Sequence, residues 1–323
     1  MSKAIRIHAH GGPEVLKWEQ VPTPQPGPNE VLVKHEAVGL NFIDVYFRTG
    51  LYKAALPTTL GMEGAGVVLA VGEKVKGFAP GERVAYAGGP LGAYATERVI
   101  NAEKLVKLPE SIDSKTAAAM MLQGLTAYFL LHRTFKVQPG QTILVHAAAG
   151  GVGLILCQWA KALGAEVIGV VSSEAKAEIA RAHGATHSII GYANLPAEVK
   201  AITGGAMVPV VYDSVGKDSF NASLDCLAPL GLMACFGNAS GPVPPVELST
   251  LAAKGSLFLT RPSFASYMSA QADILTGAAA LFDVVGSGAV KISVNQSFPL
   301  EQAAAAHTAL EARQTTGSTV LIP

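Results

Sequence analysis

Cysteine is scarce in this sequence of 323 residues, which holds only Cys157, Cys226 and Cys235. Three scattered thiols cannot form a disulfide framework, and none has the Cys-x-x-Cys or Cys-x-x-His spacing typical of a metal site. Each lies in an apolar run, where a free cysteine packs as a small hydrophobic residue. We therefore expect a reducing compartment, and the simplest one is the cytoplasm.

Net charge and long apolar runs are also lacking. The 24 basic residues balance the 24 acidic ones, and the absence of a basic block argues against nucleic-acid binding as the main task. No apolar run reaches membrane-spanning length. The most apolar stretch, residues 117–131, is interrupted by Gln123 and Thr126 and predicts a buried helix. The first residues, MSKAIRIHAHGG, contain no apolar segment of the kind found in secretory signals.

The most informative segment that is present is a strand–helix–strand unit at residues 141–173. Thr142–His146 and Val167–Val171 are β-branched, apolar runs that predict strands, and helical spacing lies between them. The connecting loop reads AAAGGVG. Gly150 would let a pyrophosphate approach main-chain N–H groups at the start of the helix, and Gly153 would let helix and strand pack closely. Between a strand and a helix, these glycines predict a dinucleotide site.

The end of the second predicted strand indicates which dinucleotide is bound. An Asp or Glu usually stands there to accept a hydrogen bond from a free ribose 2′-hydroxyl. This chain instead has Ser172, Ser173 and, within the next helical turn, Lys176. Hydroxyls and a cation suit a 2′-phosphate, although Glu174 lies among them. We therefore predict NADPH as the cofactor.

Two patterns divide the chain and predict an α/β protein of two domains. Residues 1–123 contain short alternating runs separated by Pro and Gly, which indicates a barrel-like, mainly antiparallel β domain. Residues 124–264 alternate strand and helix, which predicts a Rossmann-type, doubly wound parallel sheet of six strands. Residues 265–323 are expected to return to the first domain. The expected strands are Lys3–His8, Val31–Val38, Gly64–Val71, Arg83–Ala87 and Glu97–Ile100 in the first domain, and Thr142–His146, Val167–Val171, His187–Ile190, Pro209–Asp213, Leu232–Phe236 and Leu257–Leu259 in the second.

Several motifs of this chain recur together, and in the same order, in one protein family. They are Asn41-Phe-Ile-Asp44-Val-Tyr46-Phe-Arg48-x-Gly50-x-Tyr52, Gly61-Met62-Glu63-Gly-Ala-Gly66, Gln123-Gly-Leu-Thr126, Ala-Ala-x-Gly-Gly-Val-Gly, Phe236-Gly-Asn-Ala-Ser-Gly241 and Thr316-Gly-Ser-Thr-Val-Leu-Ile-Pro. Over nearly its whole length the chain closely resembles the NADPH:quinone oxidoreductases, the ζ-crystallin-like, zinc-free branch of the medium-chain dehydrogenase/reductase superfamily. The resemblance implies that residues 1–123 and 265–323 form a GroES-like catalytic domain.

The same resemblance addresses the question of zinc, because the superfamily includes zinc alcohol dehydrogenases. Where the zinc members carry a ligating Cys, this chain has Asn41, and where they carry Gly-His-Glu it has Gly61-Met62-Glu63. Two of the three ligands are therefore replaced by residues that do not suit zinc. We expect no metal site, and we interpret Glu63 as a structural carboxylate at a turn.

The resemblance also implies the site residues. The catalytic ones, around the nicotinamide, are Asn41, Asp44, Tyr46 and Tyr52. The residues along NADPH are Asn41, Thr126, Gly150, Gly151, Val152, Ser173, Lys176, Tyr192, Phe236, Asn238, Ser240 and Arg261. Tyr46 or Tyr52 would donate to the quinone oxygen, or else would only pack in the wall of the site. Arg48 and Asp44 are expected to pair with each other.

The function implied is NADPH-dependent reduction of a quinone without metal, by a homodimer formed through edge strands of the nucleotide-binding domain. One alternative is a reductase of α,β-unsaturated carbonyls, whose hydride acceptor is also a conjugated carbonyl. An alternative of another class is a cofactor-binding structural or RNA-binding protein, as some ζ-crystallins are. Among the histidines, His307 is expected at the surface or at a helix end. His146 is expected either to be a buried residue or to reach the cofactor loop.

Overall fold

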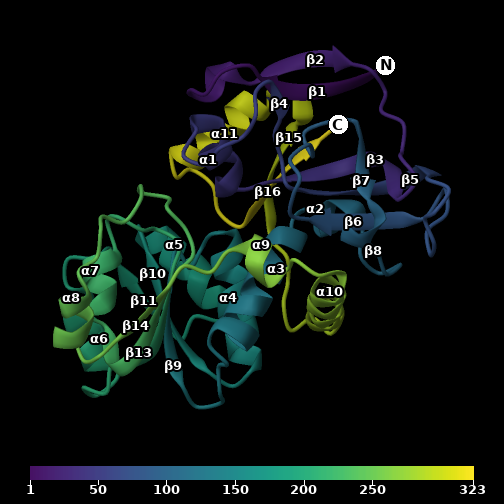
Figure 1. Ribbon diagram of the computed structural model, residues 1–323. Helices are drawn as coiled ribbons and strands as arrows, with labels where there is room; N and C mark the ends of the chain where they lie inside the picture. Colours follow the sequence, from purple (N-terminus) through teal and green to yellow (C-terminus); the bar gives the residue numbers. More distant parts are fainter. The chain divides into compact units, whose positions relative to one another are not determined.

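The computed structural model describes all residues, 1–323, and they form two compact units (Figure 1). Unit 1 comprises residues 1–125, 268–286 and 292–323, and unit 2 comprises residues 126–267 and 287–291. Residues 287–291 group with unit 2 because Gln158 forms two hydrogen bonds with the backbone of Lys291, of 3.1 and 2.9 Å. The sequence predicts boundaries after residues 123 and 264 and assigns residues 287–291 to the first domain.

Unit 2 contains a six-stranded sheet with the order β11-β10-β9-β12-β13-β14. Every neighbouring pair is parallel, which confirms the predicted doubly wound sheet. The chain crosses from β11 at one edge to β12 beside β9, so the strand order reverses between β9 and β12. The bounds are β9 Thr142–His146, β10 Glu166–Val171, β11 His187–Ile190, β12 Val208–Asp213, β13 Leu227–Cys235 and β14 Phe258–Thr260.

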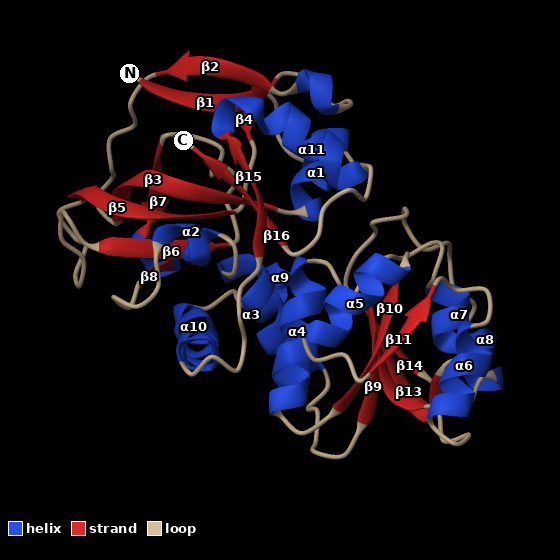
Figure 2. Ribbon diagram, turned by 180° about the vertical axis from the view of Figure 1, so that it is seen from behind, coloured by secondary structure: helices blue, strands red, loops and turns tan.

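Helices cover both faces of this sheet, which explains why its central strands are apolar on both sides. One face carries α4 (Gly151–Ala162) and α5 (Glu174–Ala182), and the other carries α6 (Leu195–Ile202), α7 (Phe220–Leu224) and α8 (Leu248–Ala253) (Figures 1 and 2). Leu144 and Val211, on adjacent strands, are fully buried in the resulting core. The short helix α9 spans Phe264–Tyr267.

Unit 1 contains two sheets made mainly of antiparallel pairs (Figure 2). The larger has the order β15-β16-β3-β5-β6-β8, with β7 also paired to β3, and the smaller has the order β2-β1-β4. Only β15 and β16 pair in parallel. The sequence misses the short strands β2, β4 and β8. The bounds are β1 Ser2–Ile7, β2 Lys17–Val21, β3 Glu30–Leu40, β4 Thr58–Thr59, β5 Glu63–Val71, β6 Arg83–Ala87, β7 Glu97–Asn101, β8 Leu105–Lys107, β15 Val294–Pro299 and β16 Ser318–Ile322.

Five helices accompany these sheets. They are α1 (Phe42–Thr49), α2 (Ser114–Ala118), α3 (Met121–Phe129), α10 (Gln271–Gly286) and α11 (Ala303–Glu311), of which α3 continues into unit 2. The single helix predicted over residues 117–131 is wrong, because α2 ends before α3 begins and the last turn, Leu130–Thr134, is π-helical. Near the break, the N–H of Leu122 donates to the Glu63 carboxylate. None of the helices combines the length and apolar character that crossing a bilayer requires.

Candidate active site

The loop after β9 has the shape of a phosphate-binding turn because only small residues fit it. Ala147 has a positive φ of 50°, and Gly150 is the N-cap of α4. A Cβ atom on Gly153 would overlap the carbonyl oxygen of Ala147 and lie 2.8 Å from the Cα of Ala148. The start of α4 can therefore press against the loop only if residue 153 is glycine. This arrangement leaves main-chain N–H groups at the helix N-terminus, where an anion is favoured.

The structure brings the predicted cofactor residues of unit 2 to one edge of the sheet. Parallel strands present their carboxyl ends at the same edge, and ligands of doubly wound folds bind there, where the strand order reverses. Thr126 lies apart from the strands, on α3. The others follow their strands directly: Gly150, Gly151 and Val152 after β9, Ser173 and Lys176 after β10, Tyr192 after β11, Phe236, Asn238 and Ser240 after β13, and Arg261 after β14.

The residues after β10 fit a phosphate. Ser173 is the N-cap of α5, and its hydroxyl oxygen lies 3.4 Å from the Lys176 N–H. Glu174, which complicates the sequence-based prediction, forms an ion pair with Arg181 at 2.5 Å. Its negative charge is therefore compensated by Arg181. The donor types here are a serine hydroxyl, a lysine ammonium and the start of a helix, which suit a 2′-phosphate better than a free ribose hydroxyl.

A buried polar cluster lies at the ends of β9 and β12, the two strands between which the strand order reverses. The Asp213 carboxylate, at the end of β12, accepts from the backbone N–H groups of Val215 and Gly216 at 2.7 and 3.1 Å. It also accepts from the Ser219 and Ser223 hydroxyls at 2.6 and 2.9 Å. The Nε2 of His146 lies 2.8 Å from the Ser223 oxygen. This cluster links the end of β9 to the end of β12. His146 is buried, as one of its two alternative predictions states, and burial lowers the pKa of its imidazole.

In unit 1, Asn41 is held by two other side chains. It follows β3 and is the N-cap of α1. Its amide nitrogen donates to Glu63 Oε2 at 2.7 Å, and its amide oxygen accepts from Gln123 at 3.2 Å. Gln123 in turn accepts from the Ser318 hydroxyl at 2.6 Å. A Cβ on Gly39 would overlap the Glu63 carboxylate. Gln123 and Ser318 lie in motifs of the family resemblance, but the sequence does not reveal this contact, because their partners come from distant segments.

Glu63 is placed to receive hydrogen bonds and not to bind zinc. Its second oxygen accepts from the Leu122 N–H at 2.7 Å, so both oxygens have donors. It lies at the start of β5 and is fully buried, and the prediction that it stands at a turn is wrong. No group of three His, Cys, Asp or Glu side chains in the structure could hold a metal ion. Asn41 and Met62 stand where the family resemblance aligns two zinc ligands, and an amide and a thioether do not suit that metal.

The stability of the protein is expected to fall as the pH rises from about 4.5 to about 8. Burial raises the pKa of Glu63 to about 8 from its ordinary value of 4.5, against the hydrogen bonds that favour the charged form. Between these values the folded state keeps a proton that the unfolded chain releases, so rising pH favours unfolding by up to about 1.4 kcal/mol for each pH unit. Urea unfolding at several pH values measures this. Glu63→Gln should reduce the dependence of the free energy of unfolding on pH, whereas the change Glu301→Gln at an exposed site should leave it unaltered.

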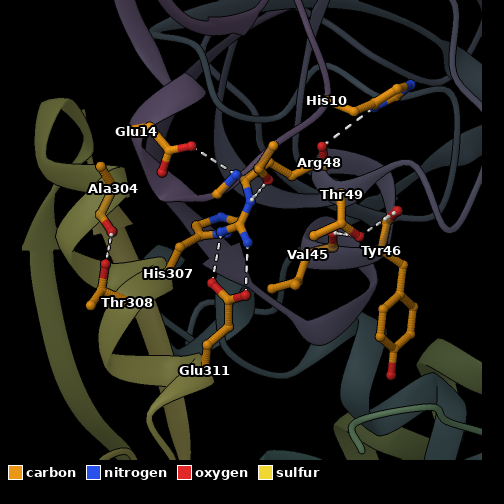
Figure 3. A network of polar contacts seen from close by, with 12 residues as sticks. His10, Glu14, Val45, Tyr46, Arg48, Thr49, Ala304, His307, Thr308 and Glu311 are labelled. Carbon is orange, nitrogen blue, oxygen red and sulfur yellow. Dashed lines mark hydrogen bonds and ion pairs between the residues drawn. The ribbon is translucent and has the colours of Figure 1, made fainter. Parts of the chain in front are cut away.

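Asp44 and Arg48 do not pair with each other, so that prediction is wrong. The Asp44 carboxylate accepts from the Asn41 N–H at 2.9 Å and from the Tyr94 hydroxyl at 3.0 Å. Arg48 makes a bidentate ion pair with Glu311 of α11, at 2.7 and 2.8 Å (Figure 3). Both side chains are buried, and each is stabilised by partners from other segments of unit 1 instead of by the other.

The prediction for His307 is also wrong, because this residue is fully buried in the middle of α11 and not at the surface or a helix end. Its Nδ1 lies 3.1 Å from Arg48 Nη1, and its Nε2 lies 3.1 Å from the Tyr94 oxygen. Burial, together with the positive charge of Arg48, lowers the pKa of His307 to about 3. His307 is therefore a neutral imidazole at any physiological pH. Tyr94 and His307 are residues that the sequence interpretation missed.

Tyr46 and Tyr52 form an aromatic cluster on the other side of α1. Their rings lie 5.2 Å apart in an edge-on arrangement, and Phe47 lies 5.6 Å from Tyr52. The backbone N–H of Tyr52 also donates to the Tyr46 carbonyl at 3.0 Å. The ring of Tyr46 points away from the guanidinium of Arg48 (Figure 3). The two rings support each other, so a change in one will affect the other.

Comparisons with known proteins agree with this geometry. Residues 27–110 match the family profile described as the alcohol dehydrogenase GroES-like domain, and residues 151–274 match the one described as zinc-binding dehydrogenase. The chain is 54% identical, over 325 residues and the full length of both chains, to a quinone oxidoreductase of Pseudomonas aeruginosa. It is 47% identical over 331 residues to a 2-haloacrylate reductase of Burkholderia, covering 100% of this chain and 99% of that protein.

Among solved structures, that of Escherichia coli quinone oxidoreductase complexed with NADPH has a TM-score of 0.97 and 47% identity, with full coverage of both chains. The glycine loop of unit 2, the parallel sheet and the antiparallel sheets of unit 1 are thus features of one known architecture. The chain is an oxidoreductase that belongs to the quinone oxidoreductase family of the medium-chain dehydrogenase/reductase superfamily.

Proposed function

We propose that this protein is an NADPH-dependent quinone reductase that works without a metal ion. The observation that carries the proposal is the gathering of the predicted NADPH contacts at the carboxyl edge of the parallel sheet, with Ser173 and Lys176 as a phosphate donor set. The E. coli relative of 47% identity, solved with NADPH, supports it. In unit 1, Asn41 and Glu63 are hydrogen-bonded to each other, which supports a site that orients its substrate by polar contacts.

Each part of the cofactor site has a distinct task in this proposal. The N–H groups of Gly151 and Val152, at the start of α4, bind the pyrophosphate, and Ser173 and Lys176 bind the 2′-phosphate. The remaining contacts along the cofactor are those of Asn41, Thr126, Gly150, Tyr192, Phe236, Asn238, Ser240 and Arg261. NADPH, when bound, supplies a hydride.

Lys176→Ala should weaken NADPH binding at least about tenfold and leave NADH binding nearly unchanged. Only NADPH carries the extra phosphate, and a hydrogen bond to a charged group contributes roughly 1.5–3 kcal/mol. Fluorescence titration with both cofactors measures the two dissociation constants. Glu178→Ala, an exposed change in the same helix, is the matched control. Equal losses for NADPH and NADH would show that Lys176 does not contact the 2′-phosphate.

On the substrate side, we assign the quinone to the segment that carries Asn41, Asp44, Tyr46 and Tyr52. A quinone accepts a hydride readily because reduction restores aromaticity, so positioning and hydrogen bonding suffice. A tyrosine hydroxyl directed at the quinone oxygen would donate to it as negative charge develops. The contact between the Tyr46 and Tyr52 rings gives both hydroxyls a defined position.

Tyr52→Phe and Tyr46→Phe should each lower quinone turnover modestly, and the double variant should lower it more. A donor that acts on developing charge is felt in kcat more than in cofactor affinity, so the dissociation constant of NADPH should stay the same. Strongly oxidising quinones should depend least on the hydroxyls. Steady-state kinetics with a series of quinones tests this. Full activity of the double Phe variant would show that neither hydroxyl donates to the quinone, so that catalysis depends only on how the cofactor and the quinone are positioned.

The proposed function is tested by NADPH oxidation across a panel of quinones and α,β-unsaturated carbonyls, including 2-haloacrylates. We expect the highest kcat/KM with quinones. A higher value with haloacrylate would favour the alternative that the Burkholderia relative supports. NADPH binding without turnover of any substrate would favour the structural or RNA-binding alternative, and a nucleic-acid binding assay would then decide it.

We further propose a homodimer in the cytoplasm. β14 is an edge strand of the unit 2 sheet, and its Phe258 is 59% exposed, so a second copy could pair with it and cover the ring. Sedimentation equilibrium measures the oligomeric state.

The proposed cytoplasmic location agrees with the cysteines, because all three are buried, free thiols, which suits a reducing compartment. Localisation of a tagged chain in its source cell tests whether the protein is cytoplasmic.

A further inference from the structure

A buried chain of hydrogen bonds in unit 1 runs from Arg48 on α1 through His307 on α11 and Tyr94 back to Asp44 on α1. Chemistry fixes the direction of its donors. Arg48 has donors only, so Nδ1 of His307 must accept from Arg48 Nη1, 3.1 Å away. His307 is neutral, so its one proton is on Nε2, which donates to the Tyr94 oxygen at 3.1 Å. The Tyr94 hydroxyl then donates to Oδ2 of Asp44 at 3.0 Å. Every step points toward the carboxylate.

Asp44 has few other groups to stabilise its charge. Its Oδ2 accepts from the Asn41 N–H and from Tyr94, while its Oδ1 is buried without a hydrogen-bond partner. Burial is the largest influence and raises the pKa of Asp44 to about 7, against these two hydrogen bonds. The Tyr94 hydroxyl is therefore the one side-chain donor that favours the charged form.

The other titratable groups around Asp44 do not replace that donor. Arg48, one helical turn along α1, is paired with Glu311 of α11, and His307 from the same helix is uncharged. Glu63 on β5 is a second buried carboxyl, which supplies no positive charge, and the charge of Asp44 helps to raise the pKa of Glu63. The pKa of Tyr94 itself is well above its usual value, because burial and Asp44 both disfavour a phenolate. Tyr94 thus remains a hydroxyl donor.

We propose that Tyr94, oriented by His307 and Arg48, is a positioning residue that keeps Asp44 a carboxylate and thereby holds Asn41 in place. The Asp44 carboxylate accepts the Asn41 N–H, and Asn41 directs its amide at Glu63, 2.7 Å away. A protonated Asp44 is a weaker acceptor, so the first turn of α1 loosens and the Asn41 amide with it. The inference rests on the proposed function only in that Asn41 and Asp44 lie at the quinone site.

The charge of Asp44 can be followed directly by NMR of the protein with ¹³C-labelled aspartate carboxyls, with Asp44→Asn to assign the signal. The wild-type signal should titrate near pH 7. In Tyr94→Phe it should titrate at least about one pH unit higher, because a hydrogen bond to the charged form is lost. Tyr86→Phe is the matched control: Tyr86 is equally buried in unit 1 but bonds to His35 at 2.6 Å. An unshifted titration in Tyr94→Phe would overturn the proposal.

A second arm measures the wild-type protein and uses a variant only to assign a signal. In the wild-type protein, ¹⁵N NMR of the histidine rings should show His307 neutral from about pH 5 to about pH 9, with its proton on Nε2. A proton on Nδ1, or a charged ring, would reverse the chain of donors and overturn the proposal. His307→Asn assigns the signal.

Kinetics connect the charge to the reaction. With NADPH and a quinone, Tyr94→Phe should lose about threefold or more in kcat/KM near pH 7 and recover most of it near pH 9, where Asp44 is ionised again. A loss that is equal at all pH values would mean a purely structural role and would contradict the proposal. If the wild type does not turn over quinone, the proposed function fails, while the two NMR arms still test the charge of Asp44.

Discussion

Gly153→Ala is expected to lower NADPH affinity by about 100-fold or more. The added Cβ would overlap the Ala147 carbonyl oxygen and approach the Ala148 Cα to 2.8 Å, and neither atom belongs to a flexible side chain. The loop and the start of α4 must then move apart. Two or more charge-assisted hydrogen bonds to the pyrophosphate are lost with the present loop geometry, at roughly 1.5–3 kcal/mol each. Isothermal titration calorimetry with NADPH measures the change.

Two other glycines provide graded controls for this experiment. A Cβ on Gly150 would lie 3.2 Å from the Ala147 oxygen, which is tight but not an overlap, so Gly150→Ala should cost less. A Cβ on Gly286, at the end of α10, would meet nothing within 4 Å, and Gly286→Ala should bind NADPH normally. A Gly153→Ala protein with native circular dichroism and unchanged affinity would show that the loop does not hold the cofactor.

The sheet of unit 2 could be predicted well because local sequence determines most of it. β9 and β11 have the predicted bounds, since each is an apolar run bordered by turn residues or helices. Buried parallel strands are apolar on both faces, which makes them visible in the sequence. Most of the predicted cofactor residues rest on the family resemblance, and the topology explains why those after the strands gather, because the carboxyl ends of parallel strands meet at one edge.

Unit 1 was less predictable, because short strands depend on distant partners. β2 reads KWEQV, without the apolar character of a core strand, and pairs only with β1 at the sheet edge. β8 has three residues and pairs with β6. Neither has enough apolar alternation to be distinguished from a loop. Their existence follows from sheet pairing, which a sequence read locally does not reveal.

The polar chain around Asp44 was missed for a similar reason. Asp44 and Arg48 have the i, i+4 spacing of a helical ion pair, which is worth a few tenths of a kcal/mol at a surface. Both are buried, however, and the tertiary partners Tyr94 and Glu311 offer stronger contacts. His307 lies in the run AAAAHTALE, in which the alanines before it occupy every face of the helix, so the sequence pattern does not show which face is buried. Its i−4 and i−1 neighbours, Ala303 and Ala306, are the only local signal of burial.

The ion pair between Arg48 and Glu311 is expected to contribute strongly to the stability of unit 1. Arg48 is only 1% exposed, and its guanidinium also donates to the Gly11 carbonyl at 3.1 Å. Glu311→Ala removes the one negative charge of this pair while the positive charge stays buried. The Glu311 carboxylate is 33% exposed, so water screens part of the change, and the cost lies below the roughly 3–5 kcal/mol of a pair buried on both sides. We expect the free energy of unfolding to fall by about 1.5–3 kcal/mol, the range for hydrogen bonds to a charged group. Urea unfolding measures it, and exposed Glu301→Ala should change stability by less than about 0.5 kcal/mol.

The double variant Arg48→Met, Glu311→Ala separates the charge from the contacts. If the cost of Glu311→Ala comes from an uncompensated buried cation, removing that cation as well should restore part of the stability, because a methionine fills most of the space without a charge. If the cost comes from lost packing of α11 against α1, the double variant should be less stable than either single one. We expect the double variant to recover part of the lost stability. We also expect Asp44 to titrate at higher pH in this variant, because Arg48 no longer fixes the tautomer of His307 and the donor chain to the carboxylate loses its orientation.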